Sequence, residues 1–176
     1  MVKVLKLFAY IFFFVLALIY FIPKESVYYY VEKELLQEKV ILSNEEIVDS
    51  GFSLELKSAK ISYDSIQSAN VESVNIKIFL LYNSLSLRNI ELSSVVSSFI
   101  PPQVESVDVR YTIFNPLNIT AKARGKFGEA NAEVNILDRN ISIVLRPSEL
   151  MLKKHKSTLR NLVKNEDGEY EYDKIF

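Results

Sequence analysis

Residues 71–77 read Val-Glu-Ser-Val-Asn-Ile-Lys, and residues 104–110 read Val-Glu-Ser-Val-Asp-Val-Arg. Apolar and polar side chains alternate through most of both stretches, which is typical of a strand with one buried face. A second pair of matching stretches, 82–87 and 114–119, follows them. Each copy therefore predicts a strand, a turn centred on Asn83 or Asn115, and a second strand. We interpret 71–87 and 104–119 as a repeated hairpin.

The same alternation extends on both sides of the repeat. Period-two segments run from Phe52 to Leu145, separated by short polar turns. They predict an antiparallel β domain over 52–146. The expected fold is mainly β: a curved meander sheet with short helices at both ends and a membrane-spanning helix before it.

Such a sheet has one large apolar face, and two terminal helices are too few to cover it. The face either packs on itself as a closed sandwich core or curls into an open trough. A trough of this kind suits acyl chains, because each buried CH₂ contributes about 0.8 kcal/mol. The residues expected to line it are Val74, Ile76, Ile78, Leu80, Val107, Val109, Tyr111 and Ile113.

Residues 7–22 contain no charged side chain, and Lys3 and Lys6 precede them. This pattern predicts a membrane anchor with residues 1–6 in the cytoplasm and the remainder exported. The competing interpretation is a cleaved signal peptide, but the bulky residues before Pro23 do not fit a cleavage site.

Helical spacing returns on both sides of the β domain. Residues 24–50 are predicted to be helical, with a second short helix starting at the capping-box pair Ser43 and Glu46. This segment either lies on the bilayer or packs against the first strands. Residues 147–165 are predicted to form one amphipathic helix with Ser148 as its N-cap. Residues 166–176 form an acidic edge strand or tail.

The C-terminal helix is rich in basic side chains. They form either a patch for anionic headgroups or an acidic partner, or an ordinary solvated helix face. The residues concerned are Lys153, Lys154, Lys156, Arg160 and Lys164.

Composition disfavours several functional classes. The chain has 176 residues, a net charge of -1, no Cys, one His and four Gly. A charge this small gives no basis for nucleic-acid binding. Without Cys, and with His155 alone among its lysine neighbours, the chain offers no thiolate site or catalytic relay. We therefore expect no enzymatic activity, no cofactor and no metal site.

The order of these parts resembles the AsmA-like superfamily, including the type II secretion system protein N family. The resemblance rests on an N-terminal span, a juxtamembrane segment ending at 40–42, amphipathic strands at 76–80 and 85–90, and the stretches 125–130 and 136–139. It implies a curved periplasmic sheet with a hydrophobic groove, anchored in a bacterial inner membrane.

The resemblance also implies a function in envelope lipid handling or transport, with phospholipid or glycolipid as ligand. The alternative is a structural or accessory subunit of a secretion or lipopolysaccharide-export complex. Such a subunit would act through protein–protein contacts, for example by pairing of strand edges.

Overall fold

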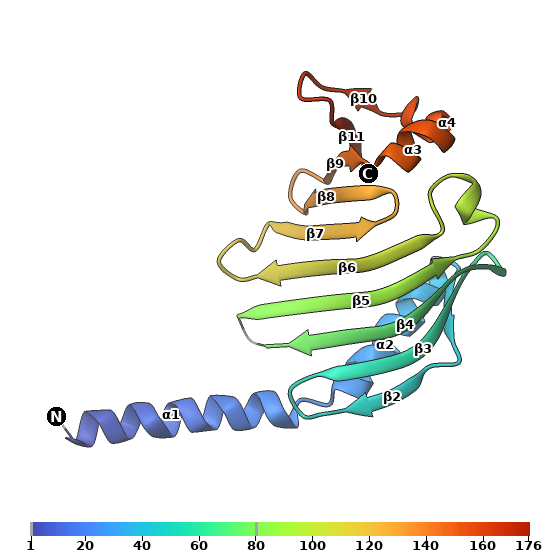
Figure 1. Cartoon of the computed structure of the whole chain (residues 1–176). Coiled ribbons are helices and arrows are strands. Elements are labelled where there is room, and N and C mark those ends of the chain that lie inside the picture. The colour runs from blue at the N-terminus through green and yellow to red at the C-terminus, as the bar shows by residue number, and fades with distance from the viewer. Residues whose placement is uncertain (1, 80) are drawn as a thin grey trace.

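The computed structural model describes residues 2–79 and 81–176, and its main feature is a single antiparallel sheet of 11 strands (Figure 1). Two helices, α1 (Val2–Phe21) and α2 (Lys24–Gln37), precede it. The strands are β1 (Val40–Ser43), β2 (Glu46–Asp49), β3 (Leu54–Tyr63), β4 (Ile66–Ile78), β5 (Tyr82–Leu92), β6 (Gln103–Thr112), β7 (Asn118–Gly125), β8 (Gly128–Asn135), β9 (Asn140–Pro147), β10 (Val163–Lys164) and β11 (Tyr170–Ile175). The 3₁₀-helix η1 (Val96–Ser98) and the short helices α3 (Glu149–Lys154) and α4 (Lys156–Leu159) complete the elements.

The strands follow one another in space almost as they do in the sequence. The order is β1-β3-β4-β5-β6-β7-β8-β9-β11-β10, and β2 pairs with the other half of β3. The first and last strands of this order do not pair with each other, so the sheet is open. The prediction of a mainly β, antiparallel sheet with short helices at both ends is confirmed. Of the two alternatives that the sequence left open, the structure has the open sheet.

The prediction that 24–50 is helical throughout is wrong beyond Gln37. Residues 40–43 and 46–49 are the strands β1 and β2, both paired with β3. Lys39 and Asn44 adopt left-handed backbone angles, with φ of 62° and 65°. These angles end α2 and turn the chain between the two strands, so the capping-box pattern at Ser43 is never used.

The repeated stretches form the hairpins β4–β5 and β6–β7, but their registers differ. Ile76 pairs with Leu85 in the first hairpin, whereas Val109, the counterpart of Ile76, pairs with Ala121 in the second. The predicted turn at Asn83 is wrong, because Asn83 lies in β5 opposite Ile78. Its side-chain oxygen instead accepts a hydrogen bond from the backbone N–H of Phe79 (3.1 Å), which supports the turn just before it.

The alternation of apolar and polar side chains shifts by one residue along a line that crosses β3, β4, β5 and β6. We call it the phase-change line. Ser58, Glu72, Asn89 and Glu105 lie opposite one another on this line, between bridged pairs on both sides. Ser58 and Asn89 have φ of 57° and 51°, and the β6–β7 register shifts at Glu105. The phase change keeps the apolar residues on both sides of the line on the same face of the sheet.

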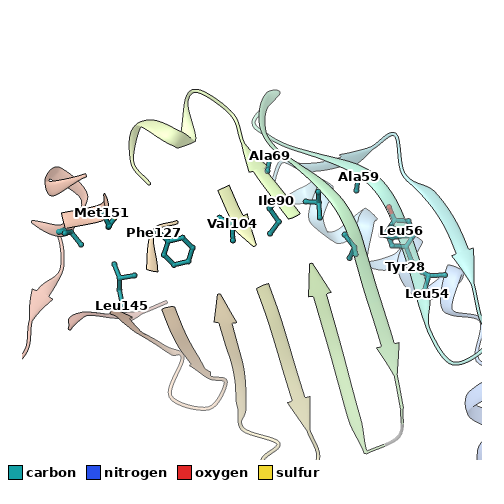
Figure 2. Close-up of a cluster of buried hydrophobic side chains, with 13 residues drawn as sticks. Tyr28, Leu54, Leu56, Ala59, Ala69, Ile90, Val104, Phe127, Leu145 and Met151 are labelled. Carbon is teal, nitrogen blue, oxygen red and sulfur yellow. The ribbon is translucent and has the colours of Figure 1, made fainter. Parts of the chain in front are cut away.

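The core lies along that apolar face (Figure 2). Tyr28 of α2 packs with Leu54 and Leu56 near the first strands of the sheet, and Met151 of α3 packs with Leu145 near the last strands. Between them the core continues through residues of β4, β5 and β6 and through Phe127, which lies just before β8. The terminal helices therefore cover one face of the sheet near its first and its last strands.

The prediction of one helix over 147–165 is wrong. Ser148 does cap α3, accepting a hydrogen bond from the Met151 N–H at 3.2 Å, as expected. The helix then breaks at His155, whose φ and ψ are -120° and 38°. Met151 before the break and Leu159 after it both belong to the core. The tail beyond it forms β10 and β11, and β11 pairs with β9.

Helix α1 is long and apolar enough to cross a membrane and is almost entirely exposed. It is attached to the sheet at its C-terminal end. The Tyr20 and Phe52 rings meet edge to face with centroids 5.4 Å apart. Gly51, at φ 77°, lies under the Tyr20 ring, where a Cβ atom would overlap it.

Candidate functional site

Strand register places apolar side chains in transverse rows on one face. One row runs Leu54, Ile76, Leu85, Val109, Ala121, Ala132, Ile143 and Tyr172, and each residue pairs with the next. The next row runs Leu56, Val74, Leu87, Val107, Ala123, Ala130, Leu145 and Tyr170. Directly paired residues share a face. We call this surface the apolar face.

The structure brings together most of the residues that the sequence predicted to line a trough. Val74, Ile76, Val107 and Val109 lie in these two rows, and Ile78 and Tyr111 lie one row nearer the strand ends. Only Val74 is fully buried, and the other five are half-buried.

The other two predicted lining residues lie elsewhere. Ile113 lies beyond β6 in a turn and is 45% exposed. Leu80 falls outside the described residues. Four further residues lie on the same face and were not among the predicted lining residues: Leu85, Leu87, Ile119 and Val134. Their alternation was visible, but it does not give the register that aligns them with β4 and β6.

The apolar face is covered unevenly. Its buried part lies near the phase-change line and beneath the terminal helices. The main helix contacts are of α2 with β1 and β2 and of α3 with β9. The loop after β5 adds Ile100, which packs against the core, and Pro101, which is buried. The part of the face toward the 113–117 turn, which we call the uncovered half, has half-buried side chains in β4–β8.

The opposite face is polar and carries paired charges. Arg88 of β5 and Asp108 of β6 form an ion pair of 2.7 Å, and the Ser86 hydroxyl donates to the same carboxylate oxygen at 2.7 Å. The hydrogen bond from Arg88 lowers the pKa of Asp108 below its usual value. These polar side chains alternate along the strands with the residues of the apolar rows, and they therefore lie on the opposite face of the sheet.

A cleft of about 520 Å³ lies on that opposite face, over the phase-change line. Lys60, Glu72, Glu91 and Glu105 line it. Glu72 accepts a hydrogen bond of 2.7 Å from the side-chain amide of Asn89. Across residues 2–79 and 81–176, no group of three or more His, Asp or Glu residues is placed to hold a metal ion.

The predicted basic residues do not form one helical stripe. Lys153 and Lys154 lie in α3, Lys156 begins α4, Arg160 follows it, and Lys164 is in β10. Lys153 pairs with Glu149 at 2.9 Å, and Lys164 lies over the Tyr170 ring at 5.9 Å from its centroid. All five are exposed.

Comparison of the chain with protein-family models, with curated proteins and with solved structures finds no match. The uncovered half of the apolar face therefore has to be interpreted from its own geometry.

Proposed function

We propose that this protein is a non-enzymatic, membrane-anchored lipid-handling protein whose uncovered half of the apolar face binds acyl chains. The supporting observation is that, in the part of the chain that the structure describes, half-buried residues such as Leu85, Val107 and Val109 form continuous apolar rows, whereas the main contacts of α2 and α3 are with β1, β2 and β9. A solvated surface of that kind is unfavourable unless something apolar covers it. An acyl chain along the rows would remove it from water at about 0.8 kcal/mol per CH₂.

In this proposal α1 spans a bacterial inner membrane with residues 1–6 in the cytoplasm. The length and composition of α1 and the two lysines that precede its uncharged stretch support this orientation. The sheet then lies in the periplasm, and its ligand is a phospholipid or glycolipid of the envelope.

Site-specific photocrosslinking in cells tests the lipid proposal. A benzoylphenylalanine residue replaces Leu85 or Val109 on the apolar face, and matched controls replace the neighbours Ser86 and Arg110, which face the other way. We expect lipid adducts, identified by mass spectrometry, at Leu85 and Val109 and not at the controls. Equal adducts on both faces, or none on either, would overturn the proposal.

A charge placed on the face provides a second test. Val109→Asp should abolish the adduct at Leu85 while the circular dichroism spectrum stays unchanged, because the side chain is only half-buried. Arg110→Asp places the same side chain on the polar face, with a larger change in net charge, and should leave the adduct intact. If Val109→Asp unfolds the protein, the face is a packed core, since an unpaired buried charge is costly.

A second candidate function is a subunit of a secretion or lipopolysaccharide-export complex that pairs its sheet edge with a partner. It is favoured by one observation at the C-terminal edge. β10 pairs only with Tyr170 and Glu171, so β11 extends past it, with Tyr172 37% and Ile175 78% exposed. Such an edge is a template for β-augmentation. Asp173→Pro should then abolish crosslinking between β11 and a partner protein, and should leave the lipid adducts at positions 85 and 109 unchanged.

A further inference from the structure

Several hairpin turns lie along one end of the sheet. Tyr82 pairs with Thr112, so the turns after β4 and β6 adjoin each other. Asn135 pairs with both Asn118 and Asn140, which places the turn after β8 beside them. Leu54 pairs with Ile76, so β3 begins at this end too, close to where α1 joins through Tyr20 and Phe52. We call this the anchor end of the sheet.

The turns at the anchor end carry large apolar side chains at their tips. Phe114 is 83% exposed and Leu137 is 71% exposed, and both belong to turns without covering elements. Ile113, Leu117 and Ile136 beside them are 45–48% exposed. Solvent-exposed turns are usually polar, so apolar side chains on separate adjoining turns indicate a surface that meets another apolar phase.

Helix α1 identifies that phase. From its junction with the sheet, α1 runs away from the anchor end along the strand direction. In the view of Figure 1 the turn after β6 reaches past this junction, alongside α1. The connection is fixed, because Lys24 is fully buried and its ammonium group donates to the carbonyl oxygens of Ile19 and Ile22, each at 3.2 Å. If α1 lies in a bilayer, turns beyond its end enter the same interface. The exposed basic side chains of Lys77, Arg110 and Arg139 flank the tips, where they suit lipid phosphates.

We propose that the 113–117 and 136–139 turns insert their tips, Phe114 and Leu137, into the bilayer that holds α1. This inference rests on the proposed function and adds the geometry of lipid entry. The far end of the apolar face is occupied by the loop after β5, with Ile100 and Pro101 packed inward. The uncovered half opens toward the anchor end. Docking the turns sets that opening against the leaflet, so an acyl chain passes between bilayer and sheet without crossing water.

Because the chain has no Trp, single replacements are unique fluorescent reporters. Full-length Phe114→Trp and Leu137→Trp are reconstituted into phosphatidylethanolamine–phosphatidylglycerol vesicles with ordinary or brominated acyl chains. Phe13→Trp within α1 reports the anchor. Val95→Trp is the matched control, since Val95 is 54% exposed in the loop at the opposite end of the same sheet. We expect strong bromine quenching at 13, 114 and 137, and none at 95.

Quenching at position 13 without quenching at 114 and 137 would overturn the docking proposal and leave the lipid-binding proposal to the crosslinking experiment. Absence of quenching at all positions would overturn the docking proposal together with the membrane anchor. A lipid carried on the apolar face could also quench position 114. The Val109→Asp background separates the two sources, because that change is expected to remove the carried lipid and leave the bilayer in place. Quenching at 114 that disappears with Val109→Asp would therefore count against docking.

Discussion

The side-chain nitrogen of Lys24 donates a hydrogen bond to the carbonyl oxygen of Ile19, 3.2 Å away, and no part of Lys24 is exposed. The same nitrogen reaches the carbonyl oxygens of Tyr20 at 3.4 Å and Ile22 at 3.2 Å. Ile19 and Tyr20 lie in the last turn of α1, whose carbonyls lack helical partners, and Ile22 follows the helix. A single lysine therefore caps α1 and fixes the direction in which it leaves the sheet.

Replacing this lysine should loosen the anchor. Lys24→Met leaves the terminal carbonyls of α1 without donors, and we expect a loss of about 1–3 kcal/mol. Denaturant unfolding of the full chain in detergent measures the loss, and faster proteolysis between α1 and α2 should accompany it. Lys33→Met is the control, because Lys33 is exposed on α2. Equal stability of the two variants would contradict the capping role.

Core and uncovered positions should respond differently to truncation. Leu56 is 2% exposed, so Leu56→Ala should lower the free energy of unfolding by about 2–5 kcal/mol. Leu85 lies one row away and is half-buried, and Leu85→Ala should cost clearly less. Chemical denaturation of lipid-free protein compares them. An equal cost would mean that the uncovered half is packed as a core.

The phase-change line depends on a left-handed residue in β5. Asn89 has φ of 51°, a conformation that Asn and Gly tolerate and β-branched residues do not. Asn89→Val should destabilise the protein by about 1–2 kcal/mol. Asn89→Gly also loses the hydrogen bond to Glu72 but keeps the backbone angle, and it should cost much less. Thermal unfolding distinguishes them, and a harmless Asn89→Val would show that the line does not need this angle.

Tyr28 should make the protein sensitive to alkaline pH. Burial, helped by the hydrogen bond to Glu45 at 2.8 Å, raises the pKa of Tyr28 well above its ordinary value of 10.0. The unfolded chain then loses the tyrosine proton before the folded chain does. The stabilisation is complete below pH 10 and falls as the pH rises above that value.

Tyr28→Phe removes this titration. Unfolding free energies measured at several pH values from 8 upward should therefore fall less steeply for Tyr28→Phe than for the natural chain. Tyr29→Phe is the control, since Tyr29 is 53% exposed on the same helix. Parallel curves for the natural chain and Tyr28→Phe would show that the folded and unfolded states release this proton together.

Local patterns predicted much of the fold. Alternation in 71–77 and 104–110 identified strands, because successive side chains of a strand point to opposite faces. The uncharged stretch 7–22 identified α1 by its length and composition alone. Of the eight predicted lining residues, six lie together on the apolar face.

Tertiary structure decided what those patterns left open. Residues 40–43 and 46–49 became strands because β3 offered them backbone partners. The C-terminal helix breaks at His155, which no local pattern indicated. A phase shift after Leu56 is visible in the sequence, but strand register lies beyond a local pattern, so neither the alignment of the shifts into one line nor the anchor end could be predicted. The sequence by itself determined which face of each strand is apolar. Only the pairing of distant strands determined that these faces join into one surface, and that its two outer edges are covered by helices.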